Sequence, residues 1–274
     1  MSLLRRYKSD FDGLMMHDHR NQFTITVFCK SLYLFLLFKL FFLRGILPEQ
    51  LLSSPWISTD AMVNIFIIAM IVTLLSGILL RVNYISAFLI FVFSFSLSRS
   101  IQAVANGSDL VLNLFLFLSI FLCSTPPFKN PTLSEGQLVV RNFFFFFCKV
   151  QVTLIYLLSG FDKITSEAWR SGEAIFSIVN LDFFFNPLIS ISLSKTDCLL
   201  IAWVTILFEL SFAFMIWIKK FRALLLLTGI VFHLAIAFLL SLPDFGLIMI
   251  LLYSLFIPFE KPLSRPKRIA FDGN

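Results

Sequence analysis

Four polar side chains recur every seven residues along one hydrophobic stretch of the sequence: Asn142, Lys149, Tyr156 and Lys163. Seven residues of α-helix turn through about 700°, about 20° short of two turns, so these side chains form one slowly drifting stripe. A lysine inside a bilayer-length apolar run costs at least about 2.5–3.5 kcal/mol on insertion scales. A sequence that needed only a membrane anchor would not place Lys149 there, so the stripe indicates a site or a buried charge pair.

The stripe runs into a polar patch that follows Gly160. Its residues are Asp162, Lys163, Thr165, Ser166, Glu167, Trp169 and Arg170. A change from apolar to polar residues of this kind is typical of a membrane boundary. Desolvation at an apolar boundary disfavours a charged ammonium group, so Lys163 is the candidate base of a site at this boundary.

Two later apolar runs each contain one ionisable residue, Glu209 in ILFELSFAFMIW and His233 in GIVFHLAIAF. Lipid offers neither side chain a partner, so both are expected to face the interior of a helix bundle. Lys149 is the expected counter-charge of Glu209, and Asn142 is expected to contribute to the same helix packing. Two interpretations remain open: Glu209 and His233 support Lys163 or relay protons, or they only fix the packing of the helices.

The composition is that of an integral membrane protein. Of the 274 residues, 58% are hydrophobic and 14% are charged, whereas soluble domains contain about 25% charged residues. The mean hydropathy is +0.91. The net charge of +6 comes from basic residues scattered between the apolar runs, so nucleic acid is not an expected partner.

Several chemistries lack their sequence motifs. The four cysteines include no C-x-x-C pair, which argues against thiol–disulfide exchange. His17 and His19 of the segment HDHR have no further ligand at useful spacing, so no metal site is expected. The sequence contains no P-loop, H-E-x-x-H or G-x-S-x-G motif for phosphate, zinc or serine-nucleophile chemistry.

Eight apolar runs are long enough to span a bilayer, which predicts an all-α, polytopic membrane helix bundle. They lie at about residues 27–47, 61–81, 83–100, 108–125, 142–162, 199–218, 222–241 and 243–259. The chain then divides into a cytoplasmic segment 1–26, a transmembrane domain 27–259 and a basic cytoplasmic tail 260–274. With both termini cytoplasmic, 14 Lys and Arg residues fall in internal segments and five in external ones, as the positive-inside rule requires.

This orientation places Lys163 and the polar patch on the extracytoplasmic side of the membrane. The external segment 163–198 is the longest, and its apolar stretch at 174–194 is interrupted by Asn180, Asp182 and Pro187. We expect this stretch to lie in the membrane interface or to re-enter the membrane, and a full span is left open.

The segment KVQVTLIYLLSGFDKITSEAWRSG, which begins at Lys149, resembles the signature of the horizontally transferred transmembrane (HTTM) domain family. The matching positions are Gln151, Tyr156, Gly160, Lys163, Trp169 and Gly172. The best-known relatives are the vitamin K-dependent γ-carboxylases, in which the lysine matching Lys163 is the base associated with oxygenation of reduced vitamin K. The resemblance implies catalytic roles for Lys163, Tyr156 and His233. It also implies a reduced quinone or vitamin K-like lipid held by Gln151 and Trp169.

Three departures argue against a complete carboxylase. A histidine that serves those enzymes is expected near Asn106-Gly107-Ser108, and none is there. Their large luminal region, which holds the peptide substrate, has no counterpart in this sequence, and Asp162 can keep its neighbour Lys163 protonated. A bacterial branch of the family is closer in size. It includes a small membrane protein that works with a partner to mature a sporulation-delaying peptide toxin.

The resemblance therefore implies a multi-pass protein of the bacterial cytoplasmic (inner) membrane that matures or modifies a secreted, toxin-like peptide at the outer face. The expected partners are the lipid bilayer, that peptide and a small partner protein. A second hypothesis is a non-catalytic membrane partner or scaffold for a secreted peptide or another membrane protein. A transporter is a third, but the sequence has no internal repeat with interrupted helices.

Overall fold

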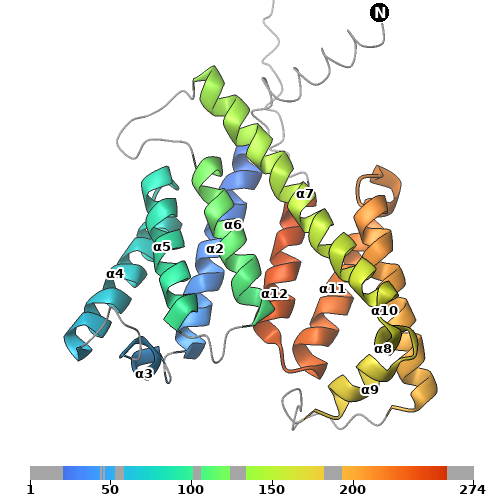
Figure 1. Ribbon diagram of the computed structural model, residues 1–274. Coiled ribbons are helices and arrows are strands. Elements are labelled where there is room, and N and C mark those ends of the chain that lie inside the picture. Colours follow the sequence, from blue (N-terminus) through green and yellow to red (C-terminus); the bar gives the residue numbers. More distant parts are fainter. Residues whose placement is uncertain are drawn as a thin grey trace, which may run out of the picture.

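The computed structural model describes residues 21–43, 45, 47–52, 59–100, 106–123, 134–181 and 193–257. Every regular element within these ranges is a helix (Figure 1). The long or apolar helices are α2 (Asn21–Leu43), α4 (Asp60–Leu79), α5 (Tyr84–Ser100), α6 (Gly107–Leu122), α7 (Glu135–Thr165), α10 (Lys195–Met215), α11 (Lys219–Leu239) and α12 (Pro243–Leu252). The short elements are α3 (Leu47–Leu52), α8 (Glu167–Arg170), α9 (Glu173–Val179) and the 3-10 helix η2 (Tyr253–Phe256).

The all-α fold class is confirmed, and an apolar helix lies on each of the eight expected runs. Five of these helices are long and apolar enough to cross a membrane: α2, α4, α7, α10 and α11. The other three, α5, α6 and α12 with η2, are apolar but shorter. The segment HDHR with His17 and His19, and the basic tail 260–274, lie outside the described residues.

The helix that carries the polar stripe is longer than expected. α7 runs for 31 residues, beyond the expected 142–162 at both ends, which corresponds to about 46 Å. Ser134 accepts a hydrogen bond from the Gln137 backbone N–H, and the Gln137 side chain accepts one from the Ser134 N–H. This capping box satisfies two otherwise unpaired backbone donors, so it fixes where the helix starts. At the other end, α7 passes through Gly160 without interruption.

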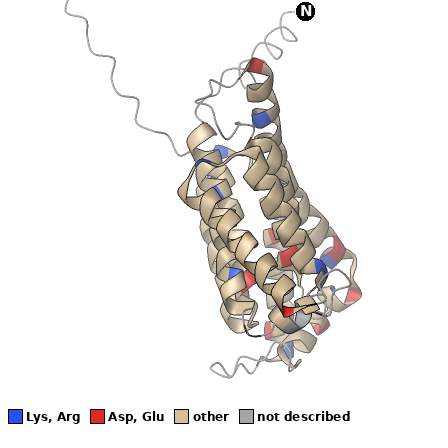
Figure 2. Cartoon of the chain, turned by 90° about the vertical axis from the view of Figure 1, so that its left-hand side faces the viewer, with Lys and Arg blue, Asp and Glu red and all other residues tan. Residues whose placement is uncertain are grey.

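The helices run alternately up and down, with α2 in the middle of the molecule (Figure 1). We call the end that carries α8 and α9 the α8 end, and the end at which α2 and α7 begin the α7-start end. α7 crosses obliquely from one end to the other (Figure 1). Figure 2 shows that most acidic residues lie toward the α8 end, whereas long stretches of the helices carry no charge.

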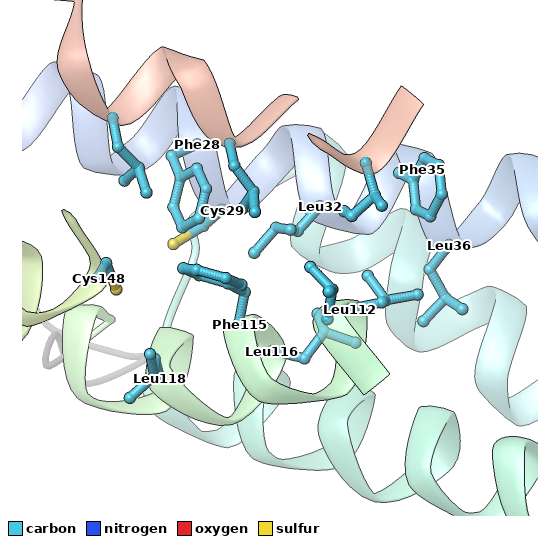
Figure 3. Packing of buried hydrophobic residues seen from close by; sticks show 14 of the residues in the cluster. Phe28, Cys29, Leu32, Phe35, Leu36, Leu112, Phe115, Leu116, Leu118 and Cys148 are labelled. Atoms are coloured by element: carbon cyan, nitrogen blue, oxygen red, sulfur yellow. The ribbon is translucent and has the colours of Figure 1, made fainter. Parts of the chain in front are cut away.

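The core forms where α2 packs on its neighbours. Phe28, Leu32 and Leu36 of α2 face Leu112 and Phe115 of α6 (Figure 3). The rings of Phe28 and Phe115 meet edge to face with 6.1 Å between their centroids. Large apolar side chains also cover the outside of the bundle, and α4 and α11 both expose many of them. Exposing such a continuous apolar surface to water is unfavourable, so this outer surface is suited to contact with lipid.

Two short helices fold the chain back over the α8 end. The turn between α8 and α9 depends on Gly172, which has a φ of 81°. A Cβ atom there would lie 2.7 Å from the backbone nitrogen of Leu199 in α10, so the turn can sit directly on that helix. α9 occupies the start of the 174–194 stretch, and residues 182–192 lie outside the described ranges. Whether that stretch spans the membrane stays a prediction.

Candidate functional site

Lys163 forms a buried ion pair with Glu209 at the α8 end of the bundle. Its Nζ lies 3.0 Å from Glu209 Oε1 and 3.0 Å from Oε2. It also donates a hydrogen bond of 2.5 Å to Ser159 Oγ, and that hydroxyl donates to Glu209 Oε1 over 3.2 Å. The Lys163 and Glu209 side chains are only 15% and 8% exposed. An ammonium, a hydroxyl and a carboxylate therefore form one closed hydrogen-bonded group.

Two features hold this group at the junction of α7 and α10. Gly160 lets the helices approach closely, because a Cβ atom there would lie 2.9 Å from Leu210 Cδ2 and 3.2 Å from Glu209 Cβ. On the other side, the Lys163 Nζ lies 4.9 Å from the centroid of the Trp169 ring in α8. The electron-rich face of an indole attracts a cation, so Trp169 further stabilises the ammonium group in this position. The neighbouring Asp162 is exposed and makes no ion pair with Lys163.

A second hydrogen-bonded group lies deeper in the bundle. The Tyr156 hydroxyl is 2.6 Å from His233 Nε2 and 2.5 Å from the Tyr253 hydroxyl. All three side chains are buried, at 2% exposure each. Gly229, one turn before His233, leaves the space that the Tyr253 hydroxyl occupies. We refer to Tyr156, His233 and Tyr253 as the buried triad.

The buried triad contains one nitrogen without a hydrogen-bond partner. Among the described residues, His233 Nδ1 has no hydrogen-bond partner, and Nε2 is already shared with Tyr156. A buried imidazole with one unsatisfied nitrogen is costly, so such groups call for a functional or structural reason. Tyr156 and Lys163 lie on the same side of α7 and are separated by seven residues, about 10 Å along the helix.

The structure brings some of the expected site residues together and separates others. Glu209 and His233 are buried inside the bundle, as expected. The expected pairing of Lys149 with Glu209 is wrong, because α7 and α10 run antiparallel and Glu209 meets Lys163, about 21 Å further along α7. The Lys149 ammonium lies instead over the Phe145 ring, 4.4 Å from its centroid.

Asn142 and Gln151 do not join Lys163. Asn142 is buried near the α7-start end, and Gln151 is a half-buried residue of the middle of α7. Gln151 precedes Lys163 by 12 residues, about 18 Å along the helix. That Gln151 and Trp169 hold a reduced quinone or vitamin K-like lipid stays a prediction.

The sequence reasoning missed a third polar group, which also lies at the α8 end. Lys39 Nζ is 2.8 Å from Asp109 Oδ1 and 3.1 Å from Asp244 Oδ2. Ser108 accepts from Lys39 over 3.0 Å, and Asp244 Oδ2 accepts from both Ser108 and Asn106. We refer to Lys39, Asn106, Ser108, Asp109 and Asp244 as the Lys39 cluster. It ties α2, α6 and α12 together.

Phe245 separates the Lys39 cluster from the buried triad. It directly follows Asp244, and its ring centroid lies 6.0 Å from that of His233. On its other side the ring covers Gly107, where a Cβ atom would lie 3.4 Å from Phe245 Cε2.

A signal for the Lys39 cluster was present in the sequence: Asp244 follows Pro243 between two apolar runs, and Lys39 lies within another.

Comparison with known proteins gives one family and one relative. The HTTM domain family matches residues 51–260 of the chain. The sporulation-delaying protein SdpB of Bacillus subtilis (strain 168) is 29% identical over 168 residues, covering 57% of this chain and 52% of the relative. The alignment thus spans about half the length of the relative. No solved structure matches the chain significantly.

Proposed function

Because this chain belongs to the HTTM domain family, we propose that it acts at the extracytoplasmic face of a bacterial inner membrane in the maturation or modification of a secreted peptide. The family match covers the helices that form the Lys163–Glu209 group and the buried triad, and it includes α6 and α12 of the Lys39 cluster but not α2, which carries Lys39. The name of the relative SdpB ties that protein to sporulation delay, and we extend a role in peptide toxin maturation to this chain as a proposal.

The topology that accompanies this proposal has eight spans and both termini in the cytoplasm. The distribution of basic residues supports it, with 14 in internal and five in external segments. In this orientation the α8 end is extracytoplasmic. Lys163, Trp169 and the Lys39 cluster then lie near the outer surface, where a secreted peptide is available.

The observation that carries a catalytic role is the closed group of Lys163, Ser159 and Glu209. When the Glu209 carboxylate takes the ammonium proton, the pair becomes a neutral amine and a neutral acid. The amine lone pair of Lys163 can then accept a proton from a substrate held beside Trp169. A low-dielectric surrounding favours this exchange, because two neutral groups need less solvation than two charged ones. Lys163 is the base in this scheme, and Glu209 stores its proton.

The buried triad lies deeper in the bundle than Lys163 and has a supporting role in the same scheme. Tyr156 and His233 are too deeply buried to touch a peptide, so their proposed role is to position α7 and α11 or to hold a proton. We derive no step through a reduced quinone or vitamin K-like lipid.

A non-catalytic partner or scaffold is the second candidate, and one observation favours it. The Lys163–Glu209 pair joins α7 to α10, and the Lys39 cluster joins three further helices. Buried ion pairs can serve helix register alone. In that case α8 and α9 form the surface on which a secreted peptide or another membrane protein docks.

The test compares peptide modification with and without Lys163. The full chain is expressed with any short secreted peptide and small companion protein that the neighbouring genes encode, and the released peptide is analysed by mass spectrometry. A catalytic role predicts that Lys163→Ala abolishes the mass change while the protein still accumulates in the membrane. Lys149→Ala is the matched control on the same helix and should retain the mass change. Full modification by the Lys163→Ala protein would overturn the catalytic role.

A further inference from the structure

A cavity at the α7-start end is lined by basic side chains. It has a volume of ≈ 260 Å³ and is partly open. Its walls come from the first turns of α2, the segment after α4, the end of α6 and the second turn of α7. It lies at the opposite end of the bundle from Lys163 and is not part of the site described above.

Three cations face this cavity: Lys30 of α2, Arg81 after α4 and Arg141 of α7. None of the described lining residues is acidic. Lys30 makes no ion pair with any acid in the described part of the chain. Arg141 is 3% exposed, so one of the three charges is set deep between helices. The amide of Gln22 adds a neutral donor at the rim.

The remaining wall is apolar apart from Thr26, and it includes two thiols, Cys29 and Cys123, whose sulfur atoms are 3.5 Å apart. Cationic side chains around one small space attract an anion, and the attraction grows as water is excluded. Guanidinium groups are especially suited to phosphate, because their N–H groups pair with two of its oxygens.

We propose that this cavity binds the phosphate head group of an anionic phospholipid. The position between membrane helices at one end of the bundle gives a lipid direct access, and basic pockets between membrane helices are known to hold such head groups. A zwitterionic lipid fits less well, because its own cation would face Lys30 and the two arginines. In the proposed topology the lipid belongs to the cytoplasmic leaflet, and its binding is independent of the chemistry at Lys163.

The experiment is native mass spectrometry of the purified full-length protein in detergent. Phosphatidylglycerol, phosphatidylcholine and inorganic phosphate are the three probes, each titrated separately. We expect the protein to retain phosphatidylglycerol in preference to phosphatidylcholine. The double variant Lys30→Gln/Arg81→Gln should bind phosphatidylglycerol at least about tenfold more weakly, because two charge-assisted contacts are lost. Both residues are partly or fully exposed, so the fold tolerates their replacement.

Lys220→Gln is the matched control. Lys220 is an exposed cation at the same end of the bundle, and its ammonium lies 5.9 Å from the Phe221 ring centroid rather than in the cavity. This variant should retain phosphatidylglycerol fully. Equal retention of both lipids by the wild type and the double variant would overturn the proposal. Binding of inorganic phosphate with no retained phosphatidylglycerol would overturn the lipid assignment and identify a soluble phosphate as the occupant.

Discussion

The Lys163 ammonium of α7 lies 3.0 Å from both carboxylate oxygens of Glu209 on α10. This contact joins two antiparallel helices at the end that carries α8 and α9. In this contact Lys163 lies beside a carboxylate that can accept its proton, and not only beside solvent. The stability of the bundle and the proposed acid–base chemistry therefore depend on the same two residues, and variants can separate the two roles.

Glu209→Leu should destabilise the protein by about 3–5 kcal/mol, because it leaves the Lys163 ammonium without its counter-charge in a site that is 15% exposed. The double variant Lys163→Met/Glu209→Leu should recover most of that loss, since no charge remains buried. Thermal unfolding in detergent of Glu209→Leu, Lys163→Met and the double variant, each compared with the wild type, gives the coupling between the residues.

Peptide modification by the same double variant separates the two candidate functions. A catalytic role predicts a protein that accumulates normally and modifies no peptide. A scaffold role predicts that restored packing restores maturation. The two outcomes exclude each other, and both are read by mass spectrometry of the secreted peptide.

Tyr156→Phe should cost about 1–3 kcal/mol of stability, because His233 Nε2 and the Tyr253 hydroxyl lose a shared partner in a buried site. The aromatic ring remains, so its contact with Phe212, at 4.1 Å between centroids, should persist. Thermal unfolding measures the change. A Tyr156→Phe protein as stable as the wild type would show that the hydroxyl network contributes nothing.

Gly229→Ala should disrupt the buried triad from a position that carries no polar group. The new Cβ atom would fall on the site of the Tyr253 hydroxyl, so that side chain has to move away from Tyr156. Overpacking of this kind costs about 1–3 kcal/mol. Gly136→Ala is the control, because nothing lies within 4 Å of its added Cβ atom. It should leave stability unchanged or raise it by up to about 1 kcal/mol, since alanine favours a helix.

Lys39→Met should destabilise the protein by about 3–5 kcal/mol, because Asp109 and Asp244 are left facing each other without a cation. Lys220→Met removes an exposed lysine and should change stability by no more than about 0.5 kcal/mol. The two proteins are compared by the temperature at which each loses its monodisperse peak in size-exclusion chromatography. Equal temperatures would mean that the Lys39 cluster does not hold α2, α6 and α12 together.

The sequence was sufficient to predict the features that a lipid bilayer imposes on the chain. Apolar runs of sufficient length indicate helices, and ionisable groups such as Glu209 and His233 must face the interior because lipid cannot solvate them. The position of Lys163 near the end of one long helix, with Trp169 just beyond that end, followed from the change in polarity after Gly160.

Which polar side chains contact each other across helices could not be predicted from the sequence in the same way. Which lysine meets Glu209 depends on how far α7 and α10 are displaced along each other, and seven-residue spacing on one helix does not determine this. The Lys39 cluster joins residues that are 69 and 205 positions apart in the chain. Tyr253 reaches the buried triad only because Gly229 leaves room for its hydroxyl. Such contacts depend on packing between helices and leave no periodic pattern in the sequence.

The uninterrupted helix α7 connects the two ends of the bundle. Arg141 lies near one end of this helix and Lys163 near the other, about 33 Å apart. A change in the tilt of α7 moves these two residues in opposite directions. The length and tilt of α7 therefore set how far Arg141 and Lys163 lie from the two surfaces of the bilayer, so the thickness of the membrane has to match this one helix.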